Sequence, residues 1–175
     1  NLYRKNSFLQ DSIGQQIFPD FINIYEQPHL PGALGSWPFD GDGVPTRSNY
    51  FVENGRVVQY VMGSYSARKM GLQTTANSDG VHNLTIDATD GDLFSVLKKM
   101  NTGFLVTELM GQGINGITGD YSRGASGFWV ENGEIQYSVD GVTIAGNLKE
   151  LFLGILAVGN DINPNSPTRC GSVLI

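Results

Sequence analysis

The side chains best suited to hold a catalytic metal in this chain are two histidines and one cysteine. They are His29, His82 and Cys170, and the 175 residues contain no other histidine or cysteine. Zinc peptidases of the HExxH type carry a histidine pair on one helix, where the spacing places both rings on one face. His29 and His82 are far apart in sequence, in segments that we predict to be loop or strand. A metal-dependent hydrolase that uses Cys170 with His29 and His82 is therefore kept only as the rival hypothesis.

Two further motifs relate to catalysis or cofactor binding, and neither predicts such a site. Gly124-Ala125-Ser126-Gly127 lacks the G-x-S-x-G spacing of a nucleophilic serine. Gly111 to Gly116 reads GQGING and satisfies G-x-G-x-x-G, which binds a dinucleotide when a helix begins there and presents its amides to the pyrophosphate. The following ITGDYSRGASGFWV has more glycines and no helical apolar spacing, so we predict no dinucleotide site.

The glycine-rich tract from Gly111 to Gly127 is the strongest candidate for a binding site. Glycine lets a backbone approach a ligand closely, and it also permits close packing of strands. Both explanations stay open from the sequence. In the first, the tract lines a cleft for an extended peptide or a partner protein. The candidate binding residues are Gln112, Gly113, Asn115, Gly116, Gly119, Tyr121 and Arg123.

Two similar phrases flank this tract and predict a repeated element. FVENGRVVQY begins at Phe51 and WVENGEIQY begins at Trp129, so the Glu-Asn-Gly triplets lie 78 residues apart. Asn-Gly between strand-like residues is typical of a two-residue hairpin turn. A helix-like stretch follows each phrase, SARKMG in one case and LKELFLGILAVG in the other. We therefore predict an internal duplication of a hairpin-helix unit.

The other segments predict an α+β fold with mostly antiparallel strands and a few helices. Leu148 to Gly159 has apolar residues at helical spacing, with Asn147 as the N-cap and Gly159 at the end. A shorter helix is predicted to begin after Asp92, which is its predicted N-cap, and a weak helical pattern covers residues 7–17. The remaining strands are predicted at residues 21–25, 81–86, 103–110 and 172–175. Asp40-Gly41-Asp42-Gly43 lacks the ligands of a calcium loop and is interpreted as a turn.

Composition excludes several classes of function. The net charge of −6 and a pI near 4.7 argue against nucleic-acid binding, which needs clustered lysine and arginine. No apolar run is long enough for a membrane span. One cysteine permits no internal disulfide, which favours a reducing cytoplasm. The length suits a single domain over residues 1–175, and the abrupt ends suggest that it is the C-terminal part of a longer chain.

The chain closely resembles the C-terminal domain of the PmbA/TldD proteins, and specifically their PmbA branch, also called TldE. The resemblance is carried by TELMGQGINGITGDYSRGASGFWVENGEIQY, VTIAGNLKELF, AVGND and RCGSVLI, and by the upstream segments YRKNSFLQDSIGQQIFPDF, SYSARKMG and GVHN. It covers essentially the whole chain. The long glycine-rich motif makes the resemblance specific.

The resemblance implies a subunit of a cytoplasmic zinc metalloprotease that acts on peptides or unfolded proteins. The family pairs a PmbA-like chain with a TldD-like chain, whose HExxxH helix and C-terminal cysteine bind zinc. Cys170 matches the position of that cysteine, but no HExxxH is present. We therefore expect no catalytic residue, metal ligand or cofactor in this chain. Zinc is expected on a TldD-like partner, in a hetero-oligomer, with a homo-oligomer as the alternative.

Overall fold

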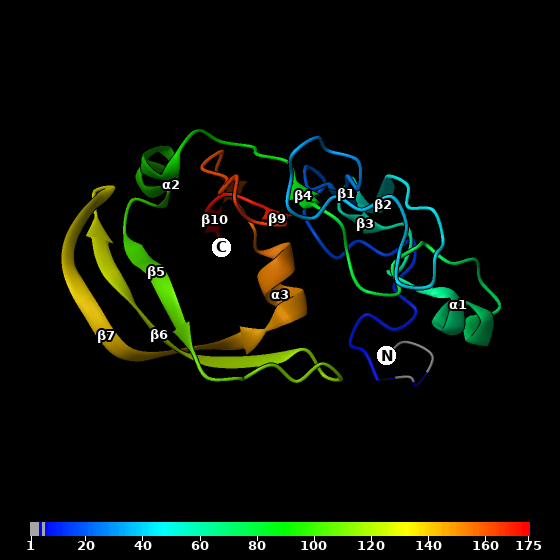
Figure 1. Cartoon of the computed structure of the whole chain (residues 1–175). Helices are drawn as coiled ribbons and strands as arrows, with labels where there is room; N and C mark the ends of the chain where they lie inside the picture. The colour runs from blue at the N-terminus through cyan, green and yellow to red at the C-terminus, as the bar shows by residue number, and fades with distance from the viewer. Residues whose placement is uncertain (1–3, 5) are drawn as a thin grey trace.

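A computed structural model describes residue 4 and residues 6–175. The strands in it form three sheets and the helices are short. Figure 1 shows how these elements are arranged. The predicted α+β class is confirmed. Most neighbouring strands in these sheets are antiparallel. The elements in chain order are β1 (Ile24–Glu26), β2 (Asn49–Glu53), β3 (Arg56–Val57), α1 (Ser64–Met70), β4 (Leu84–Ile86), α2 (Leu93–Met100), β5 (Gly103–Met110), β6 (Asp120–Glu131), β7 (Glu134–Asn147), α3 (Leu148–Leu153), β8 (Ala157–Val158), β9 (Thr168–Arg169) and β10 (Val173–Leu174).

The five-stranded sheet has the order β3-β2-β1-β4-β9 and holds most of the core. Its strands are two to five residues long. The pair β4–β9 is parallel and the other pairs are antiparallel. A separate antiparallel pair, β8 and β10, carries the last strand of the chain.

The three-stranded sheet has the order β5-β6-β7 and positions the glycine-rich tract. Its strands are the longest of the fold, and in Figure 1 they form an arch whose hollow side faces β10 and α3. β6 interrupts its pairing with β7 between Ala125 and Gly127 and again between Trp129 and Val130. Such irregularities bend a strand and increase its twist, which is consistent with the curvature.

Both Asn-Gly pairs form hairpin turns, as the sequence predicts. Asn54 and Gly55 have φ of 48° and 73°, and Asn132 and Gly133 have φ of 54° and 75°, the positive values of a type I′ turn. The first turn joins β2 to β3 and the second joins β6 to β7. The arms of the two hairpins differ greatly in length, and they belong to different sheets. Superposition of the two hairpin-helix units stays a prediction.

The helix starts agree with the predicted caps, but one helix end does not. Asp92 caps α2 by accepting from Ser95 N at 3.0 Å, and Asn147 caps α3 by accepting from Lys149 N at 3.1 Å. The prediction that the last helix continues to Gly159 is wrong, because α3 ends at Leu153. Residues 157–158 are instead buried in β8 and pair with β10. Pairing with a distant strand outweighs the local helical spacing there.

The predicted helical pattern over residues 7–17 is also wrong, because this segment forms turns. Its internal backbone bonds span three residues, as in the turns that end with Gln10 N donating to Ser7 O and Gln15 N donating to Ser12 O, and other groups bond to distant residues. Ser12 N donates to the hydroxyl of Tyr60 at 2.8 Å, and that hydroxyl donates to Leu9 O at 2.9 Å. Gly14 N donates to Val57 O at 2.7 Å. The segment is therefore fastened to the five-stranded sheet.

α3 lies between the curved sheet and the main core (Figure 1). It follows β7 directly, and its Phe152 stacks on Phe18 with ring centroids 4.7 Å apart. Phe8 also contacts Phe152, at 6.2 Å between centroids. These three rings connect α3 and the segment around Phe8 to the core of the five-stranded sheet.

Candidate pocket on the glycine-rich tract

Residues 113–115 follow β5 in the chain and pair with the beginning of β6. Ser122 N donates to Gly113 O at 2.7 Å and Asn115 N donates to Asp120 O at 2.8 Å, which makes Ile114 and Tyr121 directly opposite neighbours. Side chains of opposite residues in such a pair lie on the same face. The G-x-G-x-x-G stretch therefore leads into a strand and not into a helix, so it lacks the geometry of a dinucleotide site.

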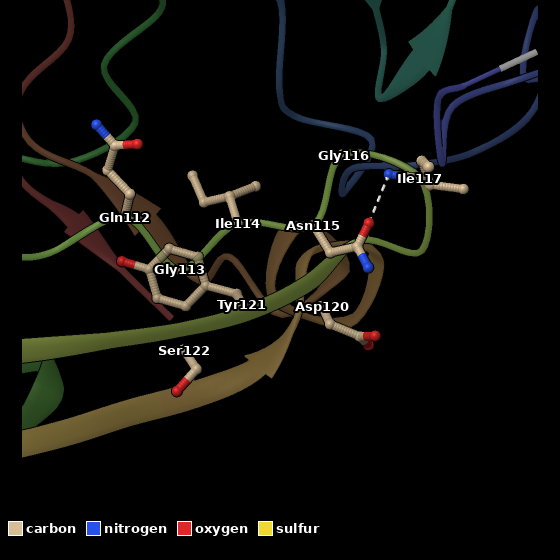
Figure 2. Close-up of a pocket in the computed structure, with 9 residues that line it drawn as sticks. All are labelled: Gln112, Gly113, Ile114, Asn115, Gly116, Ile117, Asp120, Tyr121 and Ser122. Carbon is tan, nitrogen blue, oxygen red and sulfur yellow. Dashed lines mark hydrogen bonds between the residues drawn. The ribbon is translucent and has the colours of Figure 1, made fainter.

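This hairpin carries an open pocket of about 590 Å³. Figure 2 shows the side chains of Gln112, Ile114 and Tyr121 on one side of the hairpin and that of Ser122 on the other. Ile114, Ile117 and Tyr121 give the pocket an apolar part, and Asp120 contributes a carboxylate. All its lining residues come from the tract: Gln112, Gly113, Ile114, Asn115, Gly116, Ile117, Asp120, Tyr121 and Ser122.

The structure brings most of the predicted binding residues together. Gln112, Gly113, Asn115, Gly116 and Tyr121 line the pocket. Arg123 lines an adjoining pocket of about 270 Å³, together with Gly111 to Ile114. Gly119 is buried and lines neither pocket. The binding role of all seven residues stays a prediction.

Sequence reasoning missed four residues that line the larger pocket, namely Ile114, Ile117, Asp120 and Ser122. Ile114 and Ile117 are 56% and 58% exposed, which is unusual for isoleucine. The signal was available, because two isoleucines interrupt a tract of glycine and polar residues. Their exposure shows that the fold does not use them as core.

Different structural requirements explain the individual glycines of the tract. A side chain at Gly113 would place its Cβ 1.5 Å from Ser122 O, so close strand packing explains that glycine. Gly119 has φ of +83°, and its Cβ would lie 3.2 Å from the Phe8 ring. Gly116 has neither reason, because its φ is not in the left-handed range and no atom lies within 4 Å of a built Cβ. Among these three positions, the open pocket remains as an explanation for glycine only at Gly116.

The loop from Asn115 to Asp120 forms one end of the pocket and is closed by its own polar groups. The side-chain oxygen of Asn115 accepts from Ile117 N at 3.0 Å, as Figure 2 shows. Gly119 N donates to Asn115 O at 2.8 Å. Thr118 Oγ1 donates to Asp120 Oδ2 at 2.6 Å. The loop therefore has a defined shape before any ligand binds.

The three side chains considered for a metal site lie apart and have other neighbours. His29 is exposed, with Nε2 3.0 Å from Thr46 Oγ1. His82 is buried, with Nδ1 3.4 Å from Glu26 Oε2. Within residue 4 and residues 6–175, no group of three or more histidine, cysteine or carboxylate side chains is placed to hold a metal ion. The donors present in the described chain do not fit a zinc centre.

Cys170 is half-buried against the main core and donates from Sγ to Gly171 O at 3.3 Å. Burial, with a smaller contribution from the nearby charge of Asp161, raises the pKa of the thiol above its ordinary value. The thiolate is the form that binds metals and attacks carbonyl groups. Its environment therefore favours the neutral thiol, which is poorly suited to either task.

No helix in the described part of the chain is long and apolar enough to cross a membrane.

Comparison with known proteins identifies relatives over the full length. The model of the PmbA/TldA metallopeptidase C-terminal domain matches residues 1–175. Metalloprotease PmbA of Escherichia coli O157:H7 is 53% identical over 175 residues, and the PmbA homologue of Haemophilus influenzae is 50% identical over 176. Each match covers 100% of this chain and 39% of the relative. The chain thus spans well under half the length of these relatives.

Solved structures show the same fold. A Bacteroides thetaiotaomicron protein named as a putative modulator of DNA gyrase has a TM-score of 0.92 at 34% identity, covering 98% of this chain and 39% of its own. TldE from Thermococcus kodakarensis has a TM-score of 0.82 at 26% identity, covering 99% of this chain and 44% of its own.

Proposed function

The chain belongs to the PmbA/TldA metallopeptidase family as its C-terminal domain, and from this membership we propose that it is the peptide-holding, non-catalytic domain of a two-subunit protease. In this proposal a TldD-like partner carries the zinc ion and the complex cuts peptides or unfolded proteins in the cytoplasm. The pocket on residues 111–122 binds the peptide or the partner. Homologues named TldD and TldE exist in the family, which is consistent with a hetero-oligomer.

One observation carries the proposal. Gly116 faces an open pocket although neither backbone conformation nor packing requires glycine there. A glycine at such a position keeps the backbone accessible to a ligand. The pocket combines apolar side chains with amide and carboxylate groups, the mixture that suits a peptide with its alternating apolar and polar groups.

Gly116→Val tests the binding role directly. Valine adds bulk to the pocket where the fold itself has space, so we expect the domain to fold normally while peptide cleavage by the complex falls at least about tenfold. Gly119→Val is not a clean test, because strain at a positive φ and contact with Phe8 would disturb the loop itself.

The control must add similar bulk without strain and away from the tract. Gly43→Val is a poor control, because Gly43 has φ of +77°. Ala88→Val serves instead, since Ala88 is exposed and lines neither pocket of the tract. Normal cleavage by Gly116→Val would favour the packing explanation of the tract.

The second test concerns catalysis. A hydrolytic zinc site needs about three protein ligands and a position for water. The separate locations of His29, His82 and Cys170 argue that residue 4 and residues 6–175 do not supply them. We expect the purified complete protein to contain no stoichiometric zinc and to cleave no peptide until the TldD-like partner is added. Zinc near one per chain without the partner, and cleavage lost in Cys170→Ala, would instead establish the rival hydrolase.

A further inference from the structure

The loop from Asn115 to Asp120 depends on contacts outside itself for its position. Its internal hydrogen bonds define its shape and join it to the start of β6, but they do not connect it to the core. The external contacts come from two places that are distant in sequence. Phe8 N donates to Gly116 O at 2.9 Å, and Leu148 N donates to Gly119 O at 2.7 Å. Both are backbone bonds, and neither involves a side chain that faces the pocket.

The side chain of Asn147 makes further polar contacts with this loop. Its Nδ2 donates to Thr118 O at 3.1 Å and to Asp120 Oδ1 at 3.3 Å. Its Oδ1 accepts from Lys149 N at 3.1 Å and so caps α3. One amide therefore uses its oxygen for the helix and its nitrogen for the loop. A carboxylate could perform the first task but not the second, because it has no hydrogen to donate.

The other end of this connection is anchored in the core. α3 begins at Leu148, directly after Asn147, and its Phe152 stacks on Phe18. Phe18 belongs to the buried cluster of the five-stranded sheet. A continuous chain of contacts therefore runs from the core through α3 and Asn147 to Asp120, which lines the pocket.

We propose that Asn147 is a positioning residue for the peptide pocket, holding the 115–120 loop in its binding geometry through its Nδ2 group. This inference rests on the proposed function of the tract. The loop keeps its backbone bonds from Phe8 and Leu148 when Nδ2 is removed, so the loop loosens without unfolding. A loosened loop weakens binding because the ligand must then order it, while the chemistry at the partner's centre is unchanged.

Asn147→Asp separates the two tasks of the side chain. Asp and Asn are equivalent as N-caps, so the helix keeps its cap. The variant loses both donations and places a second carboxylate beside Asp120. Asp92→Asn is the matched control, because it makes the reverse exchange at the N-cap of α2, where the side chain accepts only from Ser95. Any general effect of exchanging acid and amide at a helix cap should appear in both variants.

The experiment measures peptide cleavage by the complete protein with its TldD-like partner, and amide hydrogen exchange in the same complex. For Asn147→Asp we expect KM to rise about three- to tenfold, because the loop loses one hydrogen bond to the carbonyl of Thr118 and one to the exposed carboxylate of Asp120, with kcat within about twofold. Exchange at the amides of Asn115 and Gly119 should become faster, and the thermal midpoint should fall by no more than about 4 °C, because only local contacts are lost. Asp92→Asn should alter none of these quantities.

Three results would overturn the inference: unchanged exchange in the loop, faster exchange with an unchanged KM, or an equal change in KM for Asp92→Asn. Gly116→Val then shows which idea has failed. If that variant raises KM while Asn147→Asp does not, the pocket binds peptide and only the role of Asn147 is wrong. If neither variant affects cleavage, the proposed function of the tract is wrong as well.

Discussion

At the scale of single residues, two buried acidic side chains, Glu26 and Asp40, accept hydrogen bonds from loop backbone amides. Asp40 is 2% exposed, and its carboxylate accepts from the backbone amides of Asp42, Val44 and Ser78 at 2.9 to 3.2 Å. Residues 40–43 form the turn that the sequence predicts, and the carboxylate of Asp40 stabilises it. Burial by itself would raise the pKa of Asp40, but the three amides outweigh burial and lower the pKa below its ordinary value of 3.8.

This lowered pKa predicts how Asp40 affects acid stability. A carboxyl group whose pKa is lower in the folded state stabilises the fold above its unfolded pKa, and this stabilisation is lost as the pH falls through the folded pKa. We expect Asp40→Asn to be less stable than the wild type at about pH 7 and to lose less stability between about pH 5 and pH 2. Urea unfolding across this range measures both effects. Asp20→Asn, at an exposed position, is the control, and parallel pH curves for Asp40→Asn and the wild type would contradict the prediction.

At the scale of elements, the tip of the β6–β7 hairpin is a packing contact as well as a turn. Gly133 N donates to Asn101 O at 2.8 Å, just after α2, and a Cβ at Gly133 would lie 2.8 Å from Lys98 Cα. The repeated Asn-Gly phrase thus has two physical causes at this site, the positive φ of the turn and the closeness of the helix. The second cause is invisible in the sequence.

Two glycine substitutions separate these causes. Gly133 and Gly141 both have positive φ, +75° and +68°, but nothing lies within 4 Å of a Cβ built at Gly141. Alanine in the left-handed region costs about 1–2 kcal/mol at either site. Gly133→Ala should cost about 1–3 kcal/mol more, because the methyl group overpacks against α2. The free energy of unfolding in urea gives both values, and equal costs would show that α2 yields to the methyl group without penalty.

At the scale of the whole molecule, α3 is the element that joins the curved sheet to the main core. It is only six residues long, and its stability depends on tertiary packing more than on helix propensity. Phe152 supplies that packing through Phe18 and Phe8. Loss of this ring should therefore weaken the connection between the two parts of the molecule, including the path to the pocket loop.

Phe152→Ala tests this connection, and Phe94→Ala, at a more exposed ring, is the control. We expect the free energy of unfolding to fall by about 2–3 kcal/mol, somewhat below the cost of deleting a fully buried phenylalanine, because Phe152 is only partly buried. Phe94 on α2 is 66% exposed, so Phe94→Ala should change stability by no more than about 0.5 kcal/mol. A comparable loss in both variants would mean that α3 does not carry the connection.

The sequence by itself determined the features that depend on neighbouring residues. The two Asn-Gly turns, the caps Asp92 and Asn147, and strand β5 at Gly103–Met110 are all where local chemistry predicts them. Turn and cap preferences act within about four residues, so a single chain shows them directly. The glycine-rich tract also stood out as a candidate site because of its unusual local composition.

Only the tertiary structure decided the features that depend on distant partners. Residues 157–158 form a strand because β10 pairs with them. Residues 7–17 form turns and not a helix, because Ser12 N and Gly14 N donate to Tyr60 and Val57. Glu26, a residue type that is rarely buried, is 1% exposed because side-chain amides of Asn49 and Asn77 donate to it. The pocket is likewise a property of the fold, since Gly116 faces open space only after the hairpin has formed. Energies of pairing between residues far apart in the chain set these outcomes, and no local pattern encodes them.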